Sequence, residues 1–112
     1  MTTLRLVIRP SKQTLFTFYC KGRFPETATA VPSDETFAFV HLDCDLELPI
    51  AAGLEFFYPR LAPGGMMVIH DYESGGHWPG VRKAVNEFLK DKPESIIIVP
   101  DKSGTGVFRK IL

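Results

Sequence analysis

The sequence predicts an α/β domain whose sheet is mainly parallel, with an antiparallel strand at the C-terminal end and helices on the faces of the sheet. Three nearly continuous apolar runs, at residues 37–43, 66–72 and 95–100, are typical of strands buried in a parallel sheet. Two segments with helical spacing of apolar residues separate these runs. A short SGTG link joins the third run to residues 107–112, which predicts antiparallel pairing of the last two strands.

Residues 1–36 are expected to contribute strands and a loop. The segments 4–9 and 14–20 are rich in β-branched and aromatic side chains, and either is predicted to form a strand. Residues 22–36 are rich in Gly, Pro, Ser and Thr, which predicts a loop. The whole chain of 112 residues is expected to form one domain, in which residues 37–112 form a β-α-β-α-β-β unit.

The first helix is expected to begin at Pro49, because proline suits the first turn of a helix. Ile50, Leu54 and Phe57 follow at helical spacing and predict its buried face. Pro59 is expected to end the regular helix near Phe57.

A turn is predicted at residues 62–65, APGG, before the second apolar run. The second helix is expected to begin at Pro79 and to end before Pro93. Its apolar residues share one face: Val81, Ala84, Val85 and Phe88.

Charge and hydropathy exclude two classes of partner. The chain carries 13 basic and 13 acidic residues and a formal net charge of zero, which argues against a nucleic-acid-binding surface. No apolar run approaches the roughly 18–20 residues that a membrane-spanning helix needs. The N-terminal residues lack the pattern of a secretory signal, so a cytoplasmic protein is expected.

Acidic residues follow two of the predicted strands. Asp43 is the last residue of the run at 37–43 and Asp45 lies just past it, and His70 and Asp71 fall at the end of the second run. Ligands of open α/β sheets bind beyond the carboxyl ends of the strands, so these groups are expected to converge if the strands are neighbours. Oxygen and nitrogen ligands on one side suit Mg²⁺ or another divalent ion.

The same residues also allow a purely structural role. Asp45 is able to cap the helix that begins at Pro49, and an exposed aspartate is commonly just solvated. His70 by itself is more typical of a hydrogen-bonded structural histidine. His41, inside the strand at residues 37–43, is expected to belong to the core.

Three residues after the second apolar run are weaker candidates for contacts with a substrate. Tyr72 could donate a hydrogen bond to a ligand or anchor the loop. His77 and Trp78 could flank a ligand or belong to a packed loop.

Several motifs together resemble the C-terminal half of the macrocin-type O-methyltransferase family. They are FAFVHLDCDL, AGLEFFYPRLAPGG, MMVIHDY, WPGVRKAVNEFL and SGTGVFRK, and the resemblance covers roughly residues 18–112. The resemblance implies a class I methyltransferase that uses S-adenosylmethionine to methylate sugar or other hydroxyl groups, with Mg²⁺ in several members. It also implies a truncated Rossmann-like sheet.

The resemblance assigns roles to the acidic cluster by position. Asp43 matches the first metal carboxylate of the family, and Asp45 matches the proposed general base. His70 and Asp71 match a pair of acidic residues, so histidine stands here in place of the first acid. The family usually continues after the second aspartate with Tyr, an acid, Pro and Thr, whereas residues 47–50 are ELPI.

Class I methyltransferases hold their cofactor mainly with the first two strands and a glycine-rich loop. No such strand-turn-helix unit precedes residue 20. The chain is therefore expected to be methyltransferase-like but inactive by itself, without a complete S-adenosylmethionine site. The alternative is a non-catalytic dimeric or partner-binding module with a vestigial acidic site.

Without the first strands of that fold, the strand at residues 37–43 becomes a long apolar edge, and such edges pair with other strands. An N-terminal strand of the same chain could fill this place. Two chains could instead pair as a homodimer through this edge, or a complementing chain could supply the missing strands.

Overall fold

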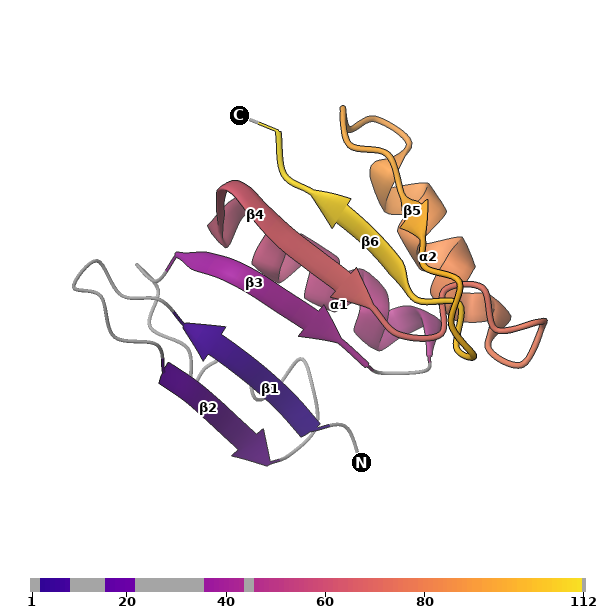
Figure 1. The fold of residues 1–112 in the computed structure, drawn as a ribbon, viewed down its shortest axis with the longest axis horizontal. Coiled ribbons are helices and arrows are strands. Elements are labelled where there is room, and N and C mark those ends of the chain that lie inside the picture. The colour runs from indigo at the N-terminus through magenta and orange to yellow at the C-terminus, as the bar shows by residue number, and fades with distance from the viewer. Residues whose placement is uncertain (1–2, 9–15, 22–35, 44–45, 112) are drawn as a thin grey trace.

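The computed structural model describes the backbone of residues 3–8 and 16–21, and residues 36–43 and 46–111 in full. The elements, labelled in Figure 1, are β1 (Thr3–Ile8), β2 (Phe16–Lys21), β3 (Phe37–Leu42), α1 (Glu47–Phe57), the 3-10 helix η2 (Tyr58–Arg60), β4 (Leu61–Ile69), α2 (Pro79–Leu89), β5 (Ile97–Ile98) and β6 (Gly106–Arg109). The strands and helices of residues 37–109 follow the expected order.

One mixed sheet with the strand order β2-β1-β3-β4-β6-β5 organises the fold (Figure 1). The expectation of a mainly parallel sheet is wrong, because β3–β4 is the one parallel pair among the described strands. The physical reason is the position of β6, which lies between β4 and β5 and is antiparallel to both. The predicted antiparallel pairing of the last two strands is confirmed.

The third apolar run is not a buried central strand. It contributes only the two residues of β5 at the edge of the sheet, and Ile97 and Ile98 are 65% and 46% exposed. The apolar residues of this segment predicted a buried parallel strand beside β4. In the structure, β6 occupies that place instead.

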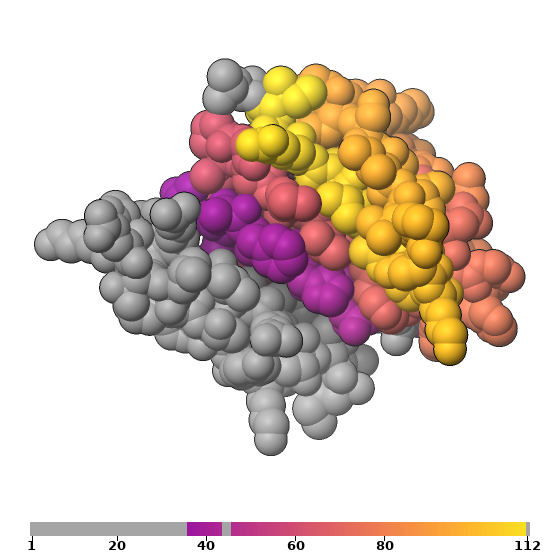
Figure 2. Space-filling model, in the orientation of Figure 1, coloured from indigo at the N-terminus to yellow at the C-terminus, as the bar shows by residue number. Residues whose placement is uncertain are grey.

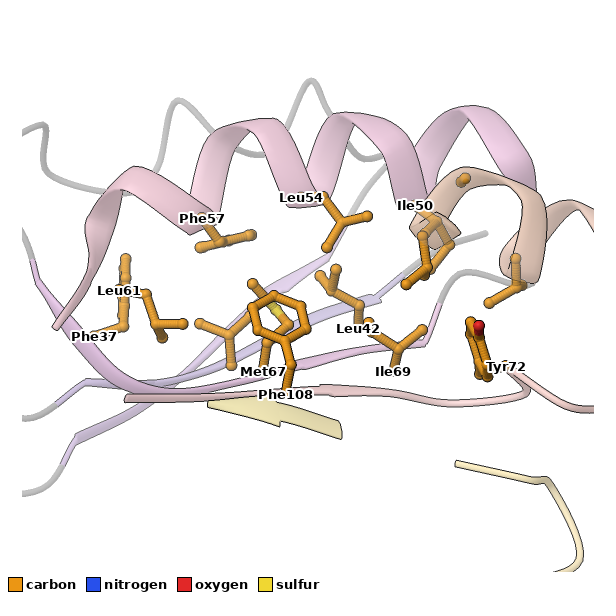
Figure 3. Close-up of a cluster of buried hydrophobic side chains, with 14 residues drawn as sticks. Phe37, Leu42, Ile50, Leu54, Phe57, Leu61, Met67, Ile69, Tyr72 and Phe108 are labelled. Carbon is orange, nitrogen blue, oxygen red and sulfur yellow. The ribbon is translucent and has the colours of Figure 1, made fainter. Parts of the chain in front are cut away.

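Both helices pack against one face of the sheet and lie side by side behind it in Figure 1. As predicted, Ile50, Leu54 and Phe57 of α1 are buried. Figure 3 shows them pointing at the sheet, over side chains of β3, β4 and β6. The buried cluster consists of Phe37, Val40, Leu42, Ile50, Leu54, Phe57, Leu61, Met67, Ile69, Tyr72, Val81, Ala84, Val85 and Phe108.

The opposite face of the sheet is turned toward the viewer in Figure 2. The helices were expected on the faces of the sheet, and neither described helix covers this face. Phe39 of β3 and Met66 of β4 are 37% and 40% exposed. Neither α1 nor α2 is long and apolar enough to cross a membrane, and the described part of the chain contains no other α-helix.

The segment APGG forms the bulged start of β4 rather than a free turn. The pairing of β3 with β4 shifts register between Phe37 and Phe39. Gly64 adopts a positive φ of 77°, and the backbones of Gly64 and Gly65 exchange hydrogen bonds with Lys110. The glycines therefore bend the strand onto β6 instead of ending it.

The free edge of β3 is paired within the chain. β1 is antiparallel to β3, with Leu6 opposite Val40 and Val7 opposite Phe39, and β2 continues the sheet outward. An N-terminal strand thus fills the place that the sequence left open. Homodimer formation and a complementing chain both stay predictions, because a single chain does not test them.

Glu94 links the C-terminal segment to the end of α1. The residue is 5% exposed, and its carboxylate accepts a hydrogen bond from the Tyr58 hydroxyl at 2.6 Å and another from the Ile111 N–H at 2.9 Å. Burial raises the pKa of Glu94, but these two hydrogen bonds, a hydrogen bond to its own backbone and the charge of Lys110 together leave its pKa below the usual value. Burial and the neighbouring Glu94 raise the pKa of Tyr58 to about 12.

This link predicts a loss of stability in acid. The lowered pKa of Glu94 means that its charged form stabilises the fold above the unfolded-state pKa and that this contribution disappears as the pH falls through the folded-state pKa. The free energy of unfolding, measured by urea titration between roughly pH 6 and pH 3, should fall less steeply in Glu94→Gln than in the wild type. Equal slopes for the two proteins would contradict this role of Glu94.

Gly104 holds the turn before β6 against the loop after β4. It has a positive φ of 60°, and its carbonyl accepts a hydrogen bond from the Glu73 N–H at 2.9 Å. A Cβ added at Gly104 would lie 2.1 Å from the Glu73 carbonyl oxygen. Only glycine fits this close approach of two backbones.

Gly104→Ala should therefore lower the free energy of unfolding by more than about 1 kcal/mol, as measured by urea titration. Gly75→Ala is the matched control, because Gly75 also has a positive φ of 68° but no neighbour within 4 Å of an added Cβ. Gly75→Ala should lower the free energy of unfolding only by the cost of a positive φ in a non-glycine residue. An equal loss in both variants would show that the contact with Glu73 is unimportant.

Candidate functional site

The carboxyl ends of β3 and β4 bring the candidate residues together. Leu42 lies opposite Ile69 in the parallel pair, and the His70 N–H donates to the Leu42 carbonyl at 2.9 Å. Asp43 and the pair His70–Asp71 therefore leave the sheet side by side. The predicted convergence of Asp43, His70 and Asp71 is present in the structure, whereas Asp45 lies outside the described residues.

His70 stands at the centre of this cluster. Its Nδ1 lies 2.7 Å from Asp71 Oδ2 and 3.2 Å from Asp43 Oδ1. The side chains of Asp43 and His70 are 52% and 37% exposed, and that of Asp71 is 13% exposed. The cluster thus has one sheltered carboxylate and two groups that solvent or a ligand can reach.

Asp71 has an unusual backbone conformation. Its φ is +62°, and it is the one non-glycine residue with positive φ in the described part of the chain. Aspartate tolerates this left-handed region better than most residues do. The turn lets consecutive residues direct both the His70 ring and the Asp71 carboxylate into the cluster.

His41 backs the cluster from β3. Its ring lies edge-on to the His70 ring, with centroids 6.2 Å apart and an interplanar angle of 62°. The expectation that His41 belongs to the core is wrong, because it is only half-buried. It lies between the buried residues Val40 and Leu42, and strand alternation directs it to the sheet face away from the helices.

The weaker candidates separate into two groups. Tyr72 belongs to the buried cluster of Figure 3 and is 4% exposed. Its hydroxyl donates to Asn86 Oδ1, so it anchors the loop to α2. Tyr72 and Trp78 also line a cavity of about 370 Å³, together with Arg82 and Asn86. His77 is exposed and is not among the residues that line this cavity.

The cavity combines one large aromatic surface with several planar polar groups. Trp78 is 39% exposed, and Arg82 forms an ion pair with Glu73. The face of a tryptophan ring packs against C–H groups, and planar polar side chains form hydrogen bonds with hydroxyl groups. The cavity therefore suits a ligand that carries both. Arg82 and Asn86 were missed in the sequence, although their i, i+4 spacing on α2 places them on one side of the helix.

The donor atoms of the cluster fit a divalent ion. One atom from each of Asp43, His70 and Asp71 lies within 4.8 Å of the other two. Ions with ligand bonds of about 2.0–2.2 Å place neighbouring ligand atoms about 3 Å apart, which is close to the separations around His70 Nδ1. These three residues could hold a metal and leave its exposed side for water or a hydroxyl group.

The described residues form a small α/β domain with one mixed sheet and two helices. The structure is similar to the O-methyltransferase NovP, with a TM-score of 0.60 and 24% identity over 69% of this chain and 31% of NovP. It is also similar to CalS11, described as a TDP-rhamnose 3′-O-methyltransferase of calicheamicin biosynthesis, with a TM-score of 0.58 and 24% identity over 67% of this chain and 32% of CalS11. The similarity to these two structures shows that this chain shares part of their fold.

The sequence pattern of the macrocin-O-methyltransferase (TylF) family matches residues 15–108. The chain belongs to this family, which confirms the resemblance found in its motifs. It spans about a third of the length of the solved structures that it matches. No curated protein sequence gives a significant match.

The contact between Tyr72 and Asn86 should be measurable as a coupling energy. Tyr72→Phe and Asn86→Ala should each lower the free energy of unfolding, and the double variant should lose about 1 kcal/mol less than the sum of the two. Urea titrations of the four proteins measure this difference. Additive losses would show that the hydrogen bond contributes nothing to the anchor.

Proposed function

We propose that this chain is the acceptor-side half of an S-adenosylmethionine-dependent O-methyltransferase. The single observation that carries the proposal is the convergence of Asp43, His70 and Asp71 at the carboxyl ends of two parallel strands, in a chain of an O-methyltransferase family. In open α/β sheets this is where ligands bind.

The proposed role of the cluster is to hold and prepare a hydroxyl group. Asp43, His70 and Asp71 would bind a divalent ion, which lowers the pKa of a hydroxyl bound to it. Asp45, which the family resemblance assigns as general base, would accept the proton. S-adenosylmethionine supplies the methyl group when it is bound.

The cavity beside α2 is the proposed place for the rest of the acceptor. Its tryptophan and planar polar groups favour a sugar, for which the Trp78 ring offers a stacking surface and Asn86 a hydrogen-bonding amide. The description of CalS11, which names TDP-rhamnose as its substrate, agrees with this choice.

The cofactor side of the reaction is proposed to come from outside these 112 residues. The matched structures are about three times as long as the part that this chain covers. The family resemblance places S-adenosylmethionine mainly on strands that precede the segment equivalent to β3. We propose that these 112 residues alone do not bind the cofactor tightly and that residues outside them complete the site.

A non-catalytic, partner-binding module is the second candidate. It is favoured by the contacts inside the cluster, where His70 already lies within 3.2 Å of both carboxylates. It is also favoured by residues 47–50, which depart from the family pattern. In that case the acidic cluster would be vestigial.

The acceptor proposal has a direct optical test, because Trp78 is the single tryptophan of the chain. Titration with TDP-rhamnose should change the fluorescence of Trp78 saturably, whereas TDP alone, which corrects for nucleotide absorbance, should have a smaller effect. Asn86→Ala should weaken the affinity about tenfold, as expected for a lost hydrogen bond of about 1.4 kcal/mol.

His77→Ala is the matched control and should leave the titration unchanged, because His77 lies outside the cavity lining. A wild-type protein that shows no saturable change would rule out a nucleotide-sugar acceptor at this cavity. Calorimetry with S-adenosylmethionine tests the other half of the proposal. Binding with a Kd in the micromolar range, about 8 kcal/mol, would show that the chain holds the cofactor unaided.

A further inference from the structure

A groove of about 510 Å³ runs between α1 and α2 on the solvent side of the helix layer. The residues of α1 that point at the sheet in Figure 3, Ile50, Leu54 and Phe57, do not line it. We call it the helix groove. Its walls include Ala51, Glu55 and Tyr58 on one side and Ala84, Glu87 and Phe88 on the other.

The helix groove follows two helices that lie side by side and run in the same direction. Gly80 at the start of α2 lies against Glu47 at the start of α1, since a Cβ added at Gly80 would be 2.9 Å from the Glu47 Cβ. At the other end, the Tyr58 and Phe88 rings meet with their centroids 5.3 Å apart. Because α1 has 11 residues, the groove is about 16 Å long, or about three helical turns.

Small side chains leave room in the helix groove for another helix. Ala51 and Ala84 contribute only methyl groups to the walls, whereas Tyr58 and Phe88 form an aromatic surface at one end. The wall residues on each helix are three or four positions apart, so each set forms a stripe along its helix. Short side chains at such a contact allow helix axes to approach closely.

The rims of the helix groove are acidic, although the whole chain has a formal net charge of zero. Four of its ten lining residues are acidic and one is basic. Two of the acidic residues each pair with a lysine, at 2.8 Å and 3.2 Å. The other two, Glu55 and Glu87, are exposed and form no ion pair with a described residue. The groove therefore complements a positively charged partner.

Lys92 of the same chain shows how a cation lies in this groove. Its ammonium is 4.7 Å from the centroid of the Phe88 ring and 5.8 Å from that of Tyr58, and it pairs with Asp91 at 2.8 Å. An aromatic face and a carboxylate together stabilise a lysine head group. This internal contact is an observation, separate from the acidic rims, that points to cationic side chains as ligands of the groove.

The backbone of the walls favours a helical partner over an extended one. Within a helix the N–H and C=O groups bond to each other, so two helices offer no row of free backbone groups to an extended segment. An extended segment in the groove would leave some of its own backbone groups without partners. A helix satisfies these groups internally and presents apolar residues at i, i+3, i+4 and i+7.

We propose that the helix groove binds an amphipathic α-helix of a partner protein that carries lysine or arginine on both sides of its apolar stripe. The apolar stripe contacts Ala51, Ala84 and Phe88. The basic residues meet Glu55 and Glu87. The helix groove shares no lining residue with the cavity proposed for the acceptor, so this inference does not depend on the proposed function.

The test uses dye-labelled, end-capped peptides of about 18 residues, a length that allows helix formation. Two of them carry leucine at helical spacing on an alanine background, and have either lysine or glutamate on both flanks. In fluorescence anisotropy titrations with the wild-type protein, the basic peptide should bind saturably and at least about tenfold more tightly than the acidic one. A basic peptide with scrambled leucine positions should bind at least about tenfold more weakly than the ordered one.

Charge reversal in the groove should reverse this preference. Glu55→Lys/Glu87→Lys should weaken the basic peptide at least about tenfold and strengthen the acidic peptide, which a merely unfolded groove would not do. Glu55→Gln/Glu87→Gln raises the net charge by two and should weaken the basic peptide about fivefold. Met66→Lys/Ile97→Lys is the matched control, because it adds the same charge at two exposed positions outside the groove and should change the affinity less than about twofold. Circular dichroism establishes that each variant is folded.

Nuclear magnetic resonance locates the bound peptide. The basic peptide should shift the backbone signals of Ala51 and Ala84 most. Shifts centred instead on Phe39 and Met66, on the opposite face of the sheet, would overturn the assignment.

Three further results would overturn the inference. They are equal affinities for the basic and acidic peptides, equal affinities for the ordered and scrambled peptides, and no binding of the basic peptide at about 1 mM protein, a concentration that detects affinities of about 4 kcal/mol. Sedimentation of the protein without peptide tests a second copy as the occupant. A dimer that Glu55→Lys/Glu87→Lys dissociates would assign the groove to that second copy and overturn the proposal, whereas a monomer agrees with it.

Discussion

The parallel pairing of β3 with β4 positions both the hydrophobic core and the candidate site. Because Leu42 lies opposite Ile69, the chain leaves both strands at the same edge, and the residues that follow must be neighbours. The same pairing lines up Val40 and Met67 on the face that α1 covers. The register of this one strand pair therefore places the hydrophobic core on one face of the sheet and the polar cluster at the carboxyl ends of the two strands.

The helix layer stabilises this pair from one face only. The aromatic rings of Phe37 and Phe57 meet edge to face, with centroids 5.4 Å apart, and join the start of β3 to the end of α1. At the other end, Tyr72 connects the loop after β4 to α2 through Asn86. The cluster and the cavity are therefore joined by one short segment: His70 and Asp71 belong to the cluster, and Tyr72 lines the cavity.

Local patterns predicted the parts of the fold that depend on neighbouring residues. The spacing of Ile50, Leu54 and Phe57 predicted the buried face of α1. Pro79 is the first residue of α2 as predicted, whereas α1 begins at Glu47, two residues before the predicted start at Pro49. Order along the chain and the position of acids after apolar runs were enough to predict that Asp43, His70 and Asp71 converge. The sequence did not identify Arg82 and Asn86 as cavity residues, because the sequence around a polar residue on a helix does not reveal which part of the protein that residue faces.

Periodicity and motifs are local properties, and they were sufficient to predict the alternation of strands and helices, the family, and the three residues of the cluster. Which strands are neighbours became known only from the folded structure. β6 lies between β4 and β5 and is antiparallel to both, so the sheet is mixed. Ile97 and Ile98 therefore lie at an exposed edge, although their side chains are as apolar as those of β4. Strand order is set by pairing between distant segments, and the apolar content of a segment does not reveal its partner.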